Sequence, residues 1–194
     1  SCIAAKRLIV EAPVYDRFVE KLTEHLAALK MGDPAEESTQ VGPIARDDLR
    51  QGLHRQVTET VNQGARCLLG GEMPSGPGFF YPVTLLADVT PGMQASCEET
   101  FGPIAVIMKA DNAEQALAMA NDTDYGLAAS IWTADTAKAE AMSREIEAGQ
   151  VSINGIVKTD PRLPSGGIKR SGYGRELGPH GIREFVNVQQ VWVG

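Results

Sequence analysis

The 194-residue sequence is poor in the residues that mark several common classes of protein. It contains only three cysteines, Cys2, Cys67 and Cys97, and three histidines, and no two cysteines stand in a Cys-x-x-Cys pair. An odd number of cysteines without paired spacing indicates neither a disulfide framework nor a zinc site. We therefore expect no bound metal and a reducing, cytoplasmic location.

Long apolar runs and clustered positive charge are also absent from the sequence. No apolar run reaches the ~18 residues that a membrane-spanning helix needs, and no stretch has the pattern of a secretory signal peptide. The 18 Lys and Arg residues are interspersed with 25 Asp and Glu residues, which gives a net charge of -7. Because nucleic-acid phosphates bind clustered basic residues, we expect neither nucleic acid nor a membrane as a partner.

The composition that remains is that of an ordinary globular protein, with 43% hydrophobic and 22% charged residues. The length predicts one domain or slightly more, and a start at Ser1 instead of Met suggests a truncated or processed chain. Apolar spacing alternates between that of strands and that of helices. We expect strands near residues 8–10, 65–69, 104–108, 127–132 and 150–154, a further apolar run at 83–89, and helices near 13–29, 46–62, 113–120 and 136–147.

This alternation predicts an α/β fold, with an open, mostly parallel sheet and helices on both faces. In the helix at 46–62, four residues spaced four apart are expected to form the buried face: Leu49, Leu53, Val57 and Val61. Gly64 is expected to end that helix.

Ligand sites of parallel sheets lie beyond the carboxyl ends of the strands. Cys97 and Asn154, with the loop after Asn154, are therefore expected to converge at that edge. Cys2 precedes its strand, so structure upstream of this chain would have to deliver it to the same place.

Two short segments carry the chemistry-bearing residues. Cys2 stands just ahead of the basic pair Lys6-Arg7, where positive charge would stabilise a thiolate, although an isolated cysteine is more often a buried small hydrophobe. The block Glu98-Glu99-Thr100-Phe101-Gly102-Pro103 places two carboxylates and one aromatic ring beside a Gly-Pro turn. Taken alone, this block would be read as a helix-terminal acid followed by a core phenylalanine.

Two later segments are less specific. Lys158, Thr159 and Arg162 are basic and hydroxyl-bearing residues that suit a carboxylate ligand, but a solvated loop with incidental charge explains them equally well. Gly172-x-Gly174 is not a dinucleotide-binding fingerprint, because no strand precedes it at the required spacing, and we interpret it as a tight turn.

In order and spacing, the segment Ser1–Arg7, the block Glu98–Pro103 and the segment Pro164–Glu176 resemble the NAD(P)-dependent aldehyde dehydrogenase superfamily. The resemblance runs along the whole chain and covers the C-terminal part of the family, from just before the nucleophilic cysteine. Residues 29–50 most resemble bacterial succinate-semialdehyde dehydrogenases.

The resemblance implies a role for each candidate residue. Cys2 matches the nucleophile, which forms a thiohemiacetal and then a thioester. Glu99 matches the residue that binds the nicotinamide ribose, and Phe101 matches the aromatic residue beside the nicotinamide ring. Lys158, Thr159 and Arg162 fall where the family selects the tail of the aldehyde. The family's general base and oxyanion amide lie upstream of Ser1, so the chain alone is expected to be inactive.

The resemblance also implies NAD or NADP as cofactor, without deciding between them, and succinate semialdehyde as substrate. Two alternatives stay open: a dehydrogenase for another aldehyde, such as an aromatic or betaine-type aldehyde, and a noncatalytic α/β interaction module with a buried cysteine. Residues 1–184 would form a catalytic domain that lacks its first strand and helix, with the cofactor-binding domain absent. Residues 185–194 would form a strand that pairs with a second copy in a homodimer or dimer-based oligomer.

Overall fold

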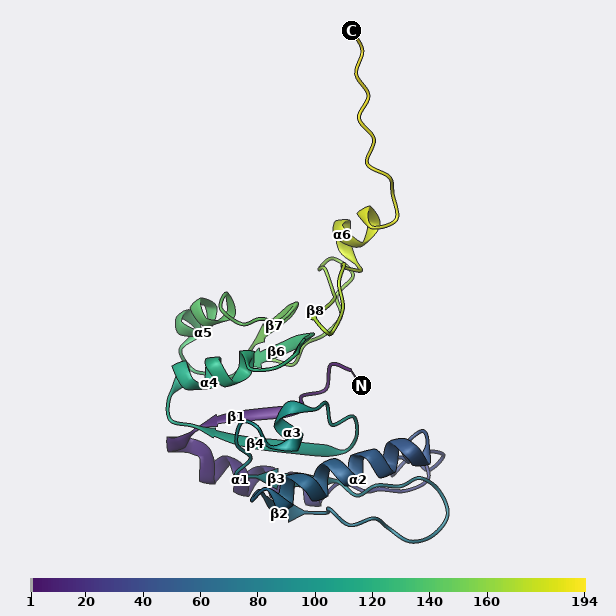
Figure 1. Ribbon diagram of the computed structural model, residues 1–194, viewed down its shortest axis with the longest axis vertical. Helices are drawn as coiled ribbons and strands as arrows, with labels where there is room; N and C mark the ends of the chain where they lie inside the picture. The colour runs from purple at the N-terminus through teal and green to yellow at the C-terminus, as the bar shows by residue number, and fades with distance from the viewer. Residues whose placement is uncertain (1) are drawn as a thin grey trace. The chain divides into compact units, whose positions relative to one another are not determined.

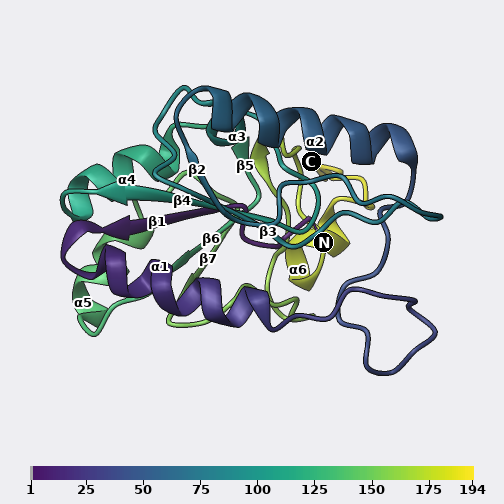
Figure 2. The same cartoon turned by 90° about the horizontal axis from the view of Figure 1, so that it is seen from below.

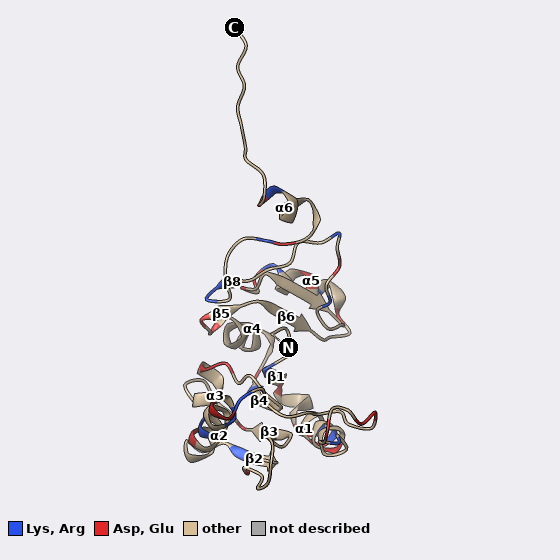
Figure 3. Cartoon of the chain, turned by 90° about the vertical axis from the view of Figure 1, so that its right-hand side faces the viewer, with Lys and Arg blue, Asp and Glu red and all other residues tan. Residues whose placement is uncertain are grey.

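The computed structural model describes residues 2–194 and has a mixed α/β fold (Figure 1). The chain divides into two compact units, Ser1–Met119 and Ala120–Gly194, which are described separately below. Lys and Arg alternate with Asp and Glu along both units (Figure 3), as the interspersed charges of the sequence predict. No helix within residues 2–194 has both the length and the apolar character needed to cross a membrane.

The first unit is built on a four-stranded sheet in the order β1-β4-β3-β2. Its central strand β4 (Ile104–Ala110) pairs in parallel with both β1 (Arg7–Glu11) and β3 (Thr84–Ala87). The edge strand β2 (Arg66–Leu69) pairs with β3 in the antiparallel sense. The predicted open and mostly parallel sheet is therefore confirmed.

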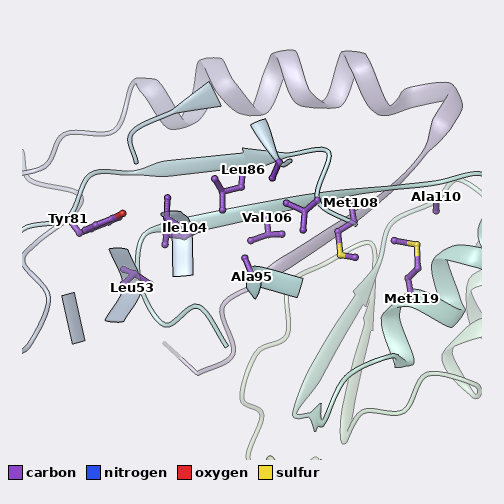
Figure 4. Close-up of a cluster of buried hydrophobic side chains, with 12 residues drawn as sticks. Leu53, Tyr81, Leu86, Ala95, Ile104, Val106, Met108, Ala110 and Met119 are labelled. Atoms are coloured by element: carbon purple, nitrogen blue, oxygen red, sulfur yellow. The ribbon is translucent and has the colours of Figure 1, made fainter. Parts of the chain in front are cut away.

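Two long helices cover opposite faces of this sheet, as Figure 2 shows. On one face, α1 (Ala12–Ala27) packs over a cluster formed by Val10, Tyr15, Leu85 and Ile107. On the other face, α2 (Asp47–Asn62) covers a larger cluster, labelled in Figure 4, that includes Leu53, Leu86 and Val106. Successive residues of a strand point to opposite faces, which explains why Leu85 and Leu86 join different clusters.

The buried face of α2 differs from the predicted one. Leu53 and Val57 are buried as expected, but Leu49 and Val61 are 47% and 37% exposed, and Thr60 is buried instead. A helix turns 100° per residue, so positions spaced strictly four apart drift around its axis by about 40° at each step. The residues that remain against the sheet, Leu53, Val57 and Thr60, are therefore spaced by four and then by three positions. The predicted end of α2 is confirmed, since Gly64 has a φ of 112°.

Two shorter helices complete the connections around this sheet. The four-residue helix α3 (Gln94–Cys97) contributes Ala95 to the cluster beneath α2, and residues 98–103 then lead into β4. The helix α4 (Ala113–Asn121) follows β4 and brings Met119 to the same cluster. The sequence predicted α4, but the single turn of α3 is too short to show a helical period.

The second unit contains two separate pairs of strands. β6 (Ala128–Ile131) and β7 (Gln150–Ile153) pair in parallel across α5 (Thr136–Ser143), whereas β5 (Tyr125–Gly126) and β8 (Ile168–Lys169) pair in the antiparallel sense. The helix predicted to reach residue 147 ends at Ser143.

A last helix and an irregular tail end the chain. The helix α6 (Gly178–Arg183) is followed by residues 184–194, which lie outside every helix and strand of the described chain (Figure 1). Gly172 and Gly174 have φ values of 124° and 75°, which fits the tight turn predicted there.

A polar cluster ties α1 to the sheet edge. The Tyr15 hydroxyl donates to Asp88 Oδ1 at 2.8 Å and accepts from the Asp88 backbone N–H at 2.9 Å. Asp88 also pairs with Arg66 of β2 at 2.5 Å. Burial raises the pKa of Tyr15 to about 12, so this hydroxyl stays protonated at ordinary pH. The hydrogen bond from Arg66, helped by that from Tyr15, holds the pKa of Asp88 below its usual value.

We predict that Tyr15→Phe lowers the free energy of unfolding by about 1–2 kcal/mol at pH 7, because Asp88 loses a donor and an acceptor together. The Asp88 carboxylate stabilises the fold above its unfolded pKa of about 3.9, and this stabilisation is lost as pH falls through the lower folded pKa. Urea unfolding of the parent and Tyr15→Phe proteins from pH 7 to pH 2.5 should therefore show that their difference in free energy of unfolding shrinks below about pH 4. A difference that stays constant over this range would contradict the assigned pairing.

Candidate active site

The segments that carry Cys2 and Phe101 lie ahead of two neighbouring parallel strands, β1 and β4. Arg7 of β1 pairs with Val106 of β4, and the Val106 N–H donates to the Lys6 carbonyl at 3.3 Å. Cys2 precedes Arg7 by five residues, and Phe101 precedes Val106 by five residues. Parallel pairing therefore brings both segments to the amino-terminal edge of the sheet.

The predicted convergence at the carboxyl ends is wrong for Cys97. This residue ends α3, which lies ahead of β4 and not beyond it. Asn154 does follow the carboxyl end of β7, but its side chain binds the backbone of Thr133. The Thr133 N–H donates to Asn154 Oδ1 at 2.9 Å, and Asn154 Nδ2 donates to the Thr133 carbonyl at 2.8 Å. We assign Asn154 a structural role in the second unit.

A direct contact joins the two segments at the amino-terminal edge. The Lys6 ammonium lies 4.6 Å from the centroid of the Phe101 ring, which is a cation–π distance. The Phe101 side chain is 53% exposed, so the interpretation of Phe101 as a core residue is wrong. An exposed ring held by a cation offers a flat apolar surface to a ligand.

The cysteine segment forms a turn ahead of β1 in which Cys2 is exposed. The alternative of a buried, small hydrophobic Cys2 is therefore wrong. Arg7 donates from Nη1 to the Met119 carbonyl at 2.9 Å, which fixes the start of β1 against α4. Lys6 follows this turn and carries positive charge on the same short segment.

The two neighbouring glutamates have different surroundings. Glu98 Oε2 accepts from Gln56 Nε2 at 2.8 Å and from Arg55 Nη2 at 3.0 Å. The Gln56 hydrogen bond, with help from Arg55, holds the pKa of Glu98 below its usual value. Glu99 is exposed, and within residues 2–194 its carboxylate makes no hydrogen bond or ion pair. The helix-terminal acid is therefore Glu98, and Glu99 is the carboxylate that a ligand can reach.

The turn after Glu99 is tightly packed. A Cβ on Gly102 would lie 2.4 Å from Leu53 Cδ2, so any larger residue here would displace the buried Leu53 side chain of α2. The Thr84 N–H donates to the Pro103 carbonyl at 2.8 Å, which ties the turn to β3. Thr100 is buried, and its hydroxyl finds no hydrogen-bond partner in the described part of the chain. These contacts fix the backbone on both sides of Phe101.

The predicted substrate residues belong to the second unit. Lys158 and Thr159 are exposed, and neither makes a side-chain hydrogen bond within residues 2–194. The Arg162 guanidinium is occupied by Asp160, with Nε at 2.9 Å and Nη2 at 2.7 Å from its two oxygens. Lys158 and Thr159 are thus available to a ligand, whereas Arg162 would first have to leave Asp160.

The residues at the amino-terminal edge fit part of a nicotinamide dinucleotide. A carboxylate such as Glu99 accepts hydrogen bonds from the hydroxyls of a ribose, and the exposed Phe101 ring can pack on a flat heteroaromatic ring. In the described chain, no three His, Cys, Asp or Glu side chains gather in a way that could hold a metal ion. A hollow of about 240 Å³ lined by Met31, Pro74 and Phe80 includes none of the candidate residues.

Sequence reasoning missed the residues of α2 that hold this edge. Gln56 and Arg55 contact Glu98 across 42 and 43 positions of sequence. A polar stripe next to the apolar face of the helix was visible in the sequence, but nothing in it indicated the partner.

Comparisons with known proteins agree on one family. The profile of the aldehyde dehydrogenase family matches residues 1–191. The sequence is 48% identical over 194 residues to a succinate-semialdehyde dehydrogenase of Mycobacterium ulcerans named for NADP+, covering 100% of this chain and 42% of that protein. It is 51% identical over 191 residues to the NAD(P)+ succinate semialdehyde dehydrogenase of Escherichia coli, covering 98% of this chain and 41% of that protein.

The fold comparison agrees with the sequence comparison. The structure matches that of a succinic semialdehyde dehydrogenase from Streptococcus pyogenes in complex with NADP+, with a TM-score of 0.95 and 36% identity. That match covers 100% of this chain and 42% of the other. The chain thus spans less than half the length of the relatives it matches.

Proposed function

Because the chain belongs to the aldehyde dehydrogenase family, we propose that it is the nucleophile-bearing part of an enzyme that oxidises an aldehyde to a carboxylate with NAD+ or NADP+. The observation that carries this proposal is the contact between Lys6 and Phe101. It joins the exposed cysteine segment to the segment that presents an exposed ring and a carboxylate without a partner in the described chain. A nucleophile and a surface for the hydride acceptor are two of the parts that this oxidation requires.

In the proposed reaction the Cys2 thiolate attacks the carbonyl carbon of the aldehyde, forming a C–S bond and a thiohemiacetal. A bound nicotinamide dinucleotide supplies the acceptor for the hydride that leaves this carbon. Cys2 then carries a thioester, and water attacks it to release the carboxylate and return the thiol.

Two residues of this chain would hold the dinucleotide near Cys2. Glu99 accepts hydrogen bonds from the hydroxyls of the nicotinamide ribose, and Phe101 packs beside the ring. The general base and the oxyanion amide are expected in the part of the protein that precedes Cys2. We therefore expect the 194-residue chain by itself to lack activity. We also propose a reducing, cytoplasmic location, since the three cysteines are unpaired.

We propose succinate semialdehyde as the substrate, since several relatives at about half identity are named for it. Its tail is a carboxylate, which the exposed Lys158 ammonium and Thr159 hydroxyl can bind. Arg162, held by Asp160, would join them only after changing partner. The competing proposal, another aldehyde, would leave these residues without a role.

We predict that Lys158→Met raises the KM for succinate semialdehyde about tenfold in the full-length protein, because one charge-assisted hydrogen bond to the tail is lost. The KM for the uncharged aldehyde butanal should change by less than about twofold. Initial rates measured with both aldehydes give the two KM values. Lys138→Met, the same substitution at a position on α5, is the control. An equal change for both aldehydes would remove Lys158 from the site.

The tail after α6 is the proposed contact with a second copy. Phe185, Val188 and Trp192 are 90%, 93% and 84% exposed, which is unusual for side chains of this size. Pairing of the extended tail with a sheet edge of another copy would cover these side chains and satisfy their backbone groups. We therefore propose a homodimer or a dimer-based oligomer.

A further inference from the structure

A polar stripe on α2 faces the segment that carries Glu99. It consists of Gln56, Thr60 and Gln63, whose spacings of four and three place them on one side of the helix. The Thr60 hydroxyl accepts from the Ala95 N–H at 2.9 Å, and Gln63 Oε1 accepts from the Gln94 N–H at 2.7 Å. The start of α3 is thus attached to α2 by side chains.

The helix α3 depends on this attachment. It has four residues, and its N-terminal neighbour Met93 provides no side-chain cap. A single helical turn has too few internal hydrogen bonds to be stable alone, and its first N–H groups need partners from elsewhere. Thr60 and Gln63 supply these partners, so the position of α3 follows that of α2.

Gln56 attaches the other end of the same segment. Its Nε2 donates to Glu98 Oε2 at 2.8 Å and to the Glu99 carbonyl at 3.2 Å. The second bond sets the orientation of the peptide plane after Glu99, because the peptide group is rigid. Arg55 strengthens the hold on Glu98 but does not reach Glu99.

The rest of the turn leaves Glu99 dependent on Gln56. Gly102 packs against Leu53, which restrains the backbone just after Phe101. The Glu99 carboxylate has no partner in the described chain that would set its direction. The orientation of this side chain is therefore determined by its backbone, and Gln56 is the side chain that binds that backbone.

We infer that Gln56 is a positioning residue, which holds the backbone of Glu99 so that its carboxylate faces the ribose of the dinucleotide. This inference rests on the proposed function, in which Glu99 binds that ribose. Gln56 acts through Glu99 and does not itself touch the cofactor.

The test is a double-mutant cycle in the full-length protein. Gln56→Leu removes both donors at similar volume, and the dissociation constant of NADPH or NADH is measured by its fluorescence. Loss of the positioning bond is expected to raise this constant about fivefold, the size of one hydrogen bond, with kcat at saturating dinucleotide within about threefold. In the Glu99→Ala background, Gln56→Leu should have no further effect, because the carboxylate that Gln56 positions is already gone.

Two further variants separate positioning from general stability. Gln51→Leu is the matched control, since Gln51 lies on the same helix and, within residues 2–194, its side chain donates only to Asp47, at 2.6 Å. It should leave the dissociation constant unchanged. Gln56→Lys keeps a donor for Glu98 and the Glu99 carbonyl, and it should restore part of the affinity.

The outcomes distinguish the inference from the proposed function. If Glu99→Ala weakens dinucleotide binding while Gln56→Leu does not, the positioning role is wrong and the proposed site stands. If Gln56→Leu weakens binding equally with and without Glu99, it acts through the fold in general, and the inference is again wrong. If Glu99→Ala has no effect, both the inference and the proposed cofactor site fail.

Discussion

Replacing Cys2 with serine is expected to lower kcat for aldehyde oxidation by at least about a thousandfold in the full-length protein. A serine hydroxyl is a far weaker nucleophile than a thiolate at neutral pH, and nothing in the cysteine segment could deprotonate it. The KM for the dinucleotide should change little, because the proposed contacts with the dinucleotide come from Glu99 and Phe101 and not from Cys2.

Cys67→Ser is the control for this substitution. The Cys67 thiol donates to the Leu69 carbonyl at 3.3 Å, and burial raises its pKa above the usual value. These surroundings disfavour a thiolate, so the variant should keep kcat within about twofold of the parent. Steady-state rates of NADPH or NADH formation measure both variants. A Cys2→Ser protein with more than a tenth of the parental kcat would refute the assignment of the nucleophile.

Replacing Glu99 with alanine is expected to raise the KM for NAD(P)+ by about 10- to 100-fold, with a much smaller change in the KM for the aldehyde. The carboxylate has no partner among residues 2–194, so its removal breaks no contact of the described fold. The loss should therefore appear in cofactor binding and not in stability. Hydrogen bonds from ribose hydroxyls to a charged acceptor account for the size of the effect.

Glu37→Ala provides the charge-matched control for Glu99. Glu37 lies exposed in the loop between α1 and α2, and it belongs to no part of the proposed site. Its removal should leave both KM values unchanged, which separates a local effect from the change in net charge. Equal KM values for NAD(P)+ in the Glu99→Ala and parent proteins would remove Glu99 from the cofactor site.

Most of the fold was predictable because its elements carry their own signals. The continuous apolar run that became β4 and the periodic apolar residues of α1 indicate a buried strand and a surface helix without reference to the rest of the chain. Where prediction failed, packing decided. Leu49 and Val61 are apolar, but the sheet covers only the face of α2 that carries Leu53 and Val57.

The site was predictable in its residues but not in its geometry. Cys2, Glu99 and Phe101 were indicated by motif, yet nothing in the sequence determines that β1 and β4 are parallel neighbours. Because of that pairing, the candidate site lies at the amino-terminal edge of the sheet and not at the carboxyl edge that was expected. The exposure of Phe101 and the hold of Gln56 on Glu99 likewise depend on contacts between residues far apart in sequence. Such contacts arise from the packing of α2 and leave no local pattern.

The central claim is that Cys2 becomes covalently acylated during the reaction. The most direct measurement is to mix the full-length protein with succinate semialdehyde and NAD(P)+, stop the reaction in acid within milliseconds to seconds, and analyse its tryptic peptides by mass spectrometry. Trypsin cleaves after Lys6, so Cys2 lies on a peptide that contains neither Cys67 nor Cys97. The account predicts an acyl group, attached as a thioester, on the Cys2 peptide alone and only when both substrates are present. Product formation without this adduct, or with the adduct on Cys67 or Cys97, would contradict it.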